Sequence, residues 1–128
     1  MDGMFVSNIS FGIPVLASIK DAADIVMDVH LMIEEPIRYV EAFHKAGADI
    51  LNVHYEACED VQATLDAIHK CGMKAGLTIK AGNTCRRVKN PYLEQAELFL
   101  NHVCRTRKMA VSHLFRNPWI RLENCVDY

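Results

Sequence analysis

The sequence lacks any apolar run long enough to cross a bilayer, which takes about 20 consecutive residues. It also lacks a basic N-terminal segment followed by an apolar core, so we expect no signal peptide. Its five cysteines are widely spaced and include no Cys-x-x-Cys pair. These absences argue against a membrane protein, a disulfide framework and a zinc module, and they favour a location in the reducing cytoplasm.

A large excess of charge of one sign is also missing, because the net charge of the chain is -2. A chain with this balance is not built as a whole to bind a polyanion. The charge is unevenly spread, however: residues 1–84 carry 6 Lys or Arg against 12 Asp or Glu, whereas residues 85–128 carry 8 against 4 and no glycine. We therefore predict a first domain over residues 1–84 and a distinct basic tail over residues 85–128.

An apolar stretch at residues 24–32 predicts a buried strand, because most of its residues are Ile, Val, Leu or Met. Asp28 and His30 lie two apart inside it, so both side chains leave the same face, with Met32 beside them. Buried polar groups cost free energy unless they are paired, hydrogen-bonded or metal-bound. One interpretation is that Asp28 and His30 are hydrogen-bonded within the core and have no functional role. The position of His30 at the carboxyl end of the strand favours a site.

Helices and strands are predicted to alternate along residues 14–79. We expect three helices, over residues 14–20, 34–46 and 59–71, and three strands, over residues 25–32, 49–55 and 73–79. The apolar residues expected to face the core are Val15, Leu16, Ile19, Ile37, Val40, Phe43, Val61, Leu65 and Ile68. Such an alternation is typical of βα units with parallel strands. A flavodoxin-like sheet and part of a (β/α)8 barrel both fit this order, although a whole barrel takes about 250 residues.

Five short motifs follow one another in an order that resembles the ribulose-phosphate 3-epimerase family. They are Met1-Asp2-Gly3-x-Phe5-Val6-x-Asn8-Ile9, Asp28-Val29-His30-Leu31-Met32, Ala46-Gly47-Ala48-Asp49, His54-x-Glu56-Ala57 and Gly72-x-Lys74-x-Gly76-Leu77. The resemblance covers residues 1–84. It implies an α/β fold, a partial (β/α)8 TIM barrel of about three βα units, followed by a divergent tail that we expect to be helical.

The resemblance implies an isomerase that interconverts ribulose 5-phosphate and xylulose 5-phosphate in the pentose phosphate pathway. Removing the proton next to a ketone makes an enediolate, whose charge a metal ion or hydrogen-bond donors must stabilise. The family uses two aspartates as acid and base, and a divalent metal, here zinc, iron, manganese or cobalt. The expected small-molecule partner is a pentulose 5-phosphate.

The resemblance carries few site residues over to this chain. His30 maps onto one of the four metal ligands of the family, which are two histidines and two aspartates. Met1 and Met32 map onto methionines that line the pocket beside the reacting carbon. Asp2 resembles a turn aspartate, and no residue maps onto the acid and base or the phosphate loop. We therefore expect His30, Met32 and Met1 to bind substrate, His30 to bind metal, and no catalytic residue.

This partial set of site residues leaves two functional hypotheses open. The chain is an epimerase by descent, an incomplete copy with weak activity or none by itself. Alternatively, it is a non-catalytic half-barrel that acts as an interaction module or homo-oligomer. Parallel strands at an open edge present unpaired backbone groups and apolar surface, which favours association.

Two weaker patterns concern polar residues outside the mapped site. For His54 and Glu56 we expect polar side chains at the solvated ends of strands. The alternative is a metal-binding set with His30, if their strands are neighbours. The turn over residues 80–84 offers backbone N–H groups to an anion, although we expect a plain turn there.

The tail, residues 85–128, interleaves basic and aromatic side chains, as some nucleic-acid-binding segments do. We favour a solvated, partly helical or disordered segment, and expect no nucleic-acid partner. Residues 91–108 are predicted to form one helix, with Leu93, Ala96, Leu100 and Val103 on its apolar face.

Overall fold

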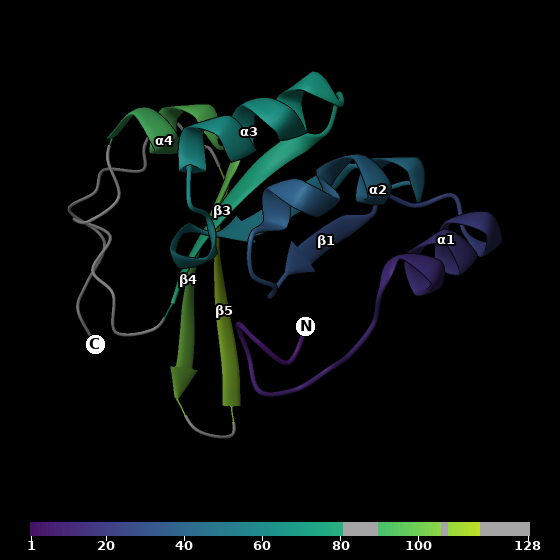
Figure 1. Ribbon diagram of the computed structural model, residues 1–128, viewed down its shortest axis with the longest axis horizontal. Coiled ribbons are helices and arrows are strands. Elements are labelled where there is room, and N and C mark those ends of the chain that lie inside the picture. Colours follow the sequence, from purple (N-terminus) through teal and green to yellow (C-terminus); the bar gives the residue numbers. More distant parts are fainter. Residues whose placement is uncertain (81–89, 106–107, 116–128) are drawn as a thin grey trace.

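The computed structural model describes residues 1–80, 90–105 and 108–115, and within them a five-stranded sheet forms the centre of the molecule (Figure 1). The strands are β1 (Asp28–Leu31), β2 (Ile50–His54), β3 (Lys74–Lys80), β4 (Leu98–Arg105) and β5 (Lys108–Phe115), and they lie side by side in that order. β1 to β4 pair in parallel, and β5 pairs with β4 in the antiparallel sense.

Helices connect the parallel strands, because a parallel pair requires a crossover. α1 (Ile13–Ala22) precedes β1, and the connecting helices are α2 (Val40–Lys45) with a preceding 3-10 turn (Pro36–Tyr39), α3 (Val61–Lys70) and α4 (Asn90–Gln95). α2, α3 and α4 lie on the same side of the sheet (Figure 1). This confirms the predicted α/β class and the arrangement of part of a TIM barrel. None of the described helices combines the length and apolarity that crossing a bilayer requires.

α3 shows why the predicted elements form where they do. The side chain of Asp60 accepts a hydrogen bond of 3.0 Å from the backbone N–H of Ala63, which caps the first turn. Leu65 and Ile68 are fully buried against the sheet. Gly72 follows the helix with a φ of 82°, a left-handed conformation that a side chain would strain. Local capping and the spacing of the apolar residues therefore mark the ends and the buried face of this helix.

The core lies between the helices and the two central strands. Five consecutive residues of β3, from Ala75 to Ile79, are buried, and so are Leu51 and Val53 in β2. A strand buried on both faces reads as a continuous apolar run rather than an alternating one. β2 and β3 lie within one residue of the strands predicted over residues 49–55 and 73–79.

The strand predicted over residues 24–32 is shorter and less buried than expected. β1 spans only Asp28–Leu31, and of its four residues only Leu31 is buried. Ile25 and Val26 are 56% and 70% exposed. In the described part of the chain β1 pairs only with β2, so it lies at an edge of the sheet and cannot be covered as a central strand is.

Three residues predicted to face the core are also exposed. Val15 and Ile19 lie on α1, and Ile37 lies in the 3-10 turn before α2. A 3-10 turn has fewer residues per turn than an α-helix, so successive side chains point in different directions. Ile37 therefore does not share the buried face that Val40 and Phe43 form on α2.

The single helix predicted over residues 91–108 is wrong. α4 ends at Gln95, and β4 begins at Leu98 and pairs with β3. The backbone N–H of Glu97 donates a 2.9 Å hydrogen bond to the carbonyl of Ala75, which starts this pairing. The backbone of β3 can form hydrogen bonds with residues 98–105, and these stabilise a strand there even though the apolar residues have the spacing of a helix. The predicted turn at 81–84 and the tail beyond residue 115 lie outside the described residues.

Candidate functional site

Two histidines from neighbouring strands meet near the carboxyl ends of β1 and β2. The Nε2 atoms of His30 and His54 lie 2.8 Å apart, and the ring centroids are 4.9 Å apart. In the register of the parallel pair His30 stands opposite Asn52, so His54, two residues further along, points from the same face. At this distance one Nε2 donates a hydrogen and the other accepts it.

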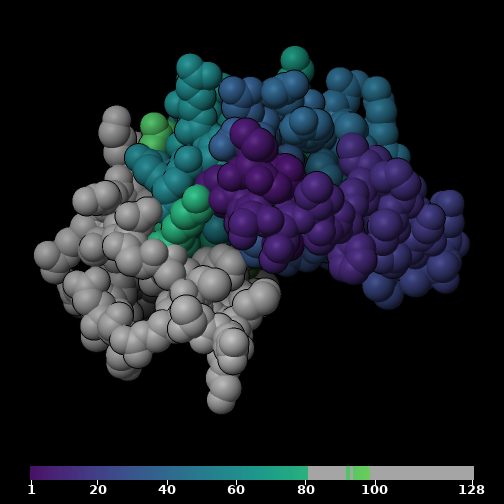
Figure 2. Space-filling view, turned by 60° about the horizontal axis from the view of Figure 1, so that its bottom comes forward, coloured from purple at the N-terminus to yellow at the C-terminus, as the bar shows by residue number. Residues whose placement is uncertain are grey.

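His54 is not the solvated strand-end residue that we expected. It is only 1% exposed. The ring of Phe5 packs against it, with centroids 4.9 Å apart, and the Lys80 ammonium lies 3.5 Å from the centroid of Phe5. Figure 2 shows the N-terminal segment, in purple, against later parts of the chain. Phe5 in this segment covers a histidine that lies far from it in the sequence.

Glu56 lies near Nδ1 of the His54 ring, whereas His30 lies near Nε2. Its Oε2 is 3.8 Å from His54 Nδ1, and its Oε1 accepts a 2.9 Å hydrogen bond from the backbone N–H of Lys80. A carboxylate near Nδ1 favours the tautomer with its hydrogen on that nitrogen.

Asp28 is exposed, which contradicts the predicted buried position beside His30. The side-chain amide of Asn52 donates a hydrogen bond to its carboxylate. Asn52 itself is 1% exposed and lies over Gly76, which has no side chain to compete for the space. Asn52 therefore connects Asp28 to the buried part of the sheet, a partner that sequence reasoning missed.

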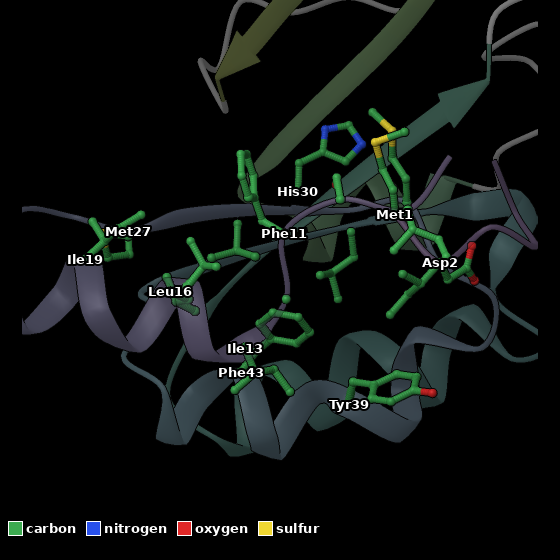
Figure 3. Close-up of a pocket in the computed structure, with 18 of the residues that line it drawn as sticks. Met1, Asp2, Phe11, Ile13, Leu16, Ile19, Met27, His30, Tyr39 and Phe43 are labelled. Carbon is green, nitrogen blue, oxygen red and sulfur yellow. The ribbon is translucent and has the colours of Figure 1, made fainter. Parts of the chain in front are cut away.

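A pocket of about 600 Å³ opens beside the histidine pair, between the N-terminal segment, α1, β1 and α2. This is within the usual range for small-molecule sites, about 300–1,000 Å³. Met1, His30 and Met32 all line it, together with apolar side chains such as Leu16 and Phe43. Figure 3 shows Met1 beside His30, on the opposite side of the pocket from Phe43. The structure thus places the three mapped residues around one cavity.

Asp2 builds the turn that carries Met1 to this pocket. Its carboxylate accepts hydrogen bonds from the backbone N–H groups of Met4 and Phe5, both at 2.9 Å, and of Glu34 at 2.7 Å. Burial, the largest single influence, raises the pKa of Asp2, but the hydrogen bonds from Glu34, Met4 and Phe5 together lower it below its usual value. The hydrogen bonds of Asp2 therefore build the turn, the position that the resemblance implied for it.

The described residues do not assemble the metal site that the resemblance implies. Within these ranges no group of three or more His, Cys, Asp or Glu side chains could hold a metal ion. The neighbour of His30 is His54, which the resemblance does not assign as a metal ligand, and no aspartate joins the two histidines in the described residues.

Comparison with known proteins gives a consistent assignment for most of the chain. The model of the ribulose-phosphate 3 epimerase family matches residues 1–101, so the likeness continues past residue 84 into β4. The ribulose-phosphate 3-epimerase of Bacillus subtilis is 51% identical over 79 residues, which are 62% of this chain and 36% of that protein.

Two further curated relatives agree. The ribulose-phosphate 3-epimerase of Rhodobacter capsulatus is 42% identical over 90 residues, 70% of this chain and 40% of that protein. That of Mycobacterium leprae is 40% identical over 94 residues, 73% of this chain and 40% of that protein. The chain thus spans two fifths or less of the length of these three relatives.

Proposed function

The chain belongs to the ribulose-phosphate 3-epimerase family, and from this premise we propose that its pocket binds a pentulose 5-phosphate. The reaction served is the interconversion of D-ribulose 5-phosphate and D-xylulose 5-phosphate in the pentose phosphate pathway, by proton transfer at the carbon next to the ketone. The observation that carries the proposal is the convergence of Met1, His30 and Met32 on one pocket, which runs along β1 at the edge of the described sheet.

The side chains around the pocket fit this chemistry in part. The thioethers of Met1 and Met32 form an apolar wall that would exclude water from a reactive enediolate. An N–H of His30 would stabilise the negative oxygen that develops when the proton leaves. None of the described residues is assigned as the acid or the base.

We expect the purified chain to bind ribulose 5-phosphate but to show no measurable epimerase turnover. Binding requires the pocket, whereas turnover also requires an acid and a base for the two faces of the carbon. Binding is measured by the shifts of the methionine methyl resonances on titration with the sugar phosphate. Turnover is measured in a coupled assay for xylulose 5-phosphate.

His44, which is exposed on α2, provides the matched control for His30. His30→Ala should weaken binding, and His44→Ala should leave it unchanged. Equal binding by all three proteins would refute the pocket as the sugar-phosphate site. Turnover that His30→Ala abolishes and His44→Ala preserves would show that the chain is a complete catalyst.

A second candidate function is self-association as a non-catalytic half-barrel. Four large apolar side chains beside β1 and α1 are exposed: Ile9, Phe11, Ile25 and Val26. Together with the edge of β1 they form a surface that a second copy of the chain would cover. Light scattering after size exclusion should give the mass of a dimer, and Val26→Lys should reduce it to that of a monomer. A wild-type chain that is monomeric and stable would exclude this function.

Two further expectations remain predictions. One is the division into a ribulose-phosphate-binding part, residues 1–84, and a basic tail, residues 85–128; the pairing of β4 with β3 carries the sheet itself past residue 84. The other is the cytoplasmic location.

A further inference from the structure

We propose that Asp28 binds hydroxyl groups of the ligand and that Asn52 positions the Asp28 carboxylate for this role, an inference that rests on the proposed function. It names the side chain of the pocket that recognises the sugar chain. The resemblance assigns neither residue to the site. What carries the inference is a buried amide, Asn52, that holds an exposed acid in the pocket.

Asn52 is unfavourable for stability at its position in β2. It is 1% exposed, and its Oδ1 has no hydrogen-bond partner in the part of the chain that the structure describes. A buried polar atom without a partner costs free energy, which an apolar side chain of similar shape would avoid. The Nδ2 of the same amide donates a hydrogen bond to the carboxylate of Asp28. Stability alone therefore does not explain an asparagine here.

The bond from Asn52 adds little stability through Asp28 either. Asp28 is exposed, so water would hydrogen-bond its carboxylate if Asn52 were absent. The bond does fix the orientation of the carboxylate, because Asn52 is packed over Gly76, where a side chain would otherwise fill the space. Proteins retain such locally unfavourable polar groups mainly at functional sites.

The carboxylate of Asp28 lies in the pocket proposed for the sugar phosphate. Asp28 and His30 both line this pocket, and they point from the same face of β1, about 7 Å apart along the strand. An extended pentulose chain is long enough to contact both side chains. Asp2, the other acid among the described residues of the lining, already accepts three backbone hydrogen bonds in its turn. Asp28 is therefore the acid that is placed to contact a ligand.

A carboxylate selects the chemical groups that it binds. It accepts hydrogen bonds at about four lone-pair sites, so the bond from Asn52 leaves capacity for the hydroxyl groups of a sugar. Hydrogen bonds to an ionised group are among the stronger ones. The same charge repels a phosphate. The ligand should therefore lie with its hydroxyl-bearing end at Asp28 and its phosphate away from it.

The affinity for ribulose 5-phosphate tests the role of Asp28, and it is measured from the methionine methyl shifts on titration. Asp28→Ala should weaken binding at least about tenfold. Asp24→Ala is the matched control, because Asp24 is an exposed acid just before β1 and lies outside the pocket, so its affinity should equal that of the wild type. Equal affinity in Asp28→Ala and the wild type would overturn the proposal.

Asn52→Ala tests whether Asn52 acts through Asp28. It should lower the affinity at least about twofold in the wild-type background and have no effect in Asp28→Ala, because the two side chains share one contact. A purely structural role would lower the affinity equally in both backgrounds, and that result would refute Asn52 as a positioning residue. Urea unfolding of each variant shows that the protein measured is folded.

The charge of Asp28 gives a test that leaves Asn52 unchanged. Asp28→Asn keeps the size of the side chain and removes its charge. The wild type should bind ribulose 5-phosphate more tightly than ribulose 1,5-bisphosphate, whose additional phosphate would lie at Asp28. In Asp28→Asn this preference should fall roughly fivefold. A preference of the same size in both proteins would contradict the proposed contact.

Failure of this inference is distinguishable from failure of the proposed function. A wild type that does not bind ribulose 5-phosphate at all would overturn both. Wild-type binding that Asp28→Ala leaves intact would overturn the inference alone. Weaker binding in Asp28→Ala, with wild-type affinity in Asp24→Ala, would support both.

Discussion

Gly76→Ala is expected to destabilise the chain by about 1–3 kcal/mol, the usual cost of forcing extra atoms into a packed core. A Cβ at Gly76 would lie 1.6 Å from Oδ1 and 2.3 Å from Cγ of Asn52. Asn52 is 1% exposed and cannot move aside without losing its hydrogen bond to Asp28. The free energy of unfolding in urea, followed by circular dichroism, measures the effect.

The double variant Asn52→Ala/Gly76→Ala tests whether the loss of stability in Gly76→Ala comes from the clash with Asn52 or from another effect of the new methyl group. Asn52→Ala removes the atoms that the new methyl group would meet, so Gly76→Ala should cost much less in that background. Contacting residues are expected to show such non-additivity. An equal cost in both backgrounds would mean that the close approach of Asn52 is not the reason for the glycine.

Leu65→Ala should have the larger effect, a loss of about 2–5 kcal/mol in the free energy of unfolding. Leu65 has no exposed surface and lies in the middle of α3, where that helix packs on the sheet. Removing its side chain loses buried apolar contacts and leaves a cavity. Because a domain of this kind is stable by only about 5–15 kcal/mol, the variant should unfold at a clearly lower urea concentration.

Ile37→Ala serves as the matched control, since it also shortens a branched aliphatic side chain. Ile37 is 42% exposed in the 3-10 turn, so its truncation should change stability by about 0.5 kcal/mol or less. Comparable losses in the two variants would contradict the placement of Leu65 in the core and Ile37 at the surface.

The sequence by itself determined the elements whose causes are local. Asp60 caps α3, the spacing of Val61, Leu65 and Ile68 gives that helix its buried face, and Gly72 ends it. The same reasoning predicted β2, β3 and the parallel βα order. Helix caps, apolar periodicity and left-handed glycines act over a few residues, so they can be recognised before any tertiary contact is known.

The candidate site could be predicted only in part. His30 was identified because it ends an apolar strand and because its motif resembles that of a family. Its contact with His54 depends on strand order and register, and Phe5, which packs against His54, comes from the N-terminal segment before α1. The sequence allowed His54 as a partner but could not choose between that contact and a solvated position.

Only the tertiary structure decided which apolar segments are covered and which conformation the segment after Gln95 adopts. Ile25 and Val26 are as apolar as the residues of β3, yet they are exposed because β1 lies at the edge of the described sheet. Residues 98–105 have a spacing that fits a helix, yet they form β4 because β3 offers a free side to pair with. Both outcomes depend on what lies next to a segment in space, and neighbours in space contribute hydrogen bonds and buried area that local propensity does not contain.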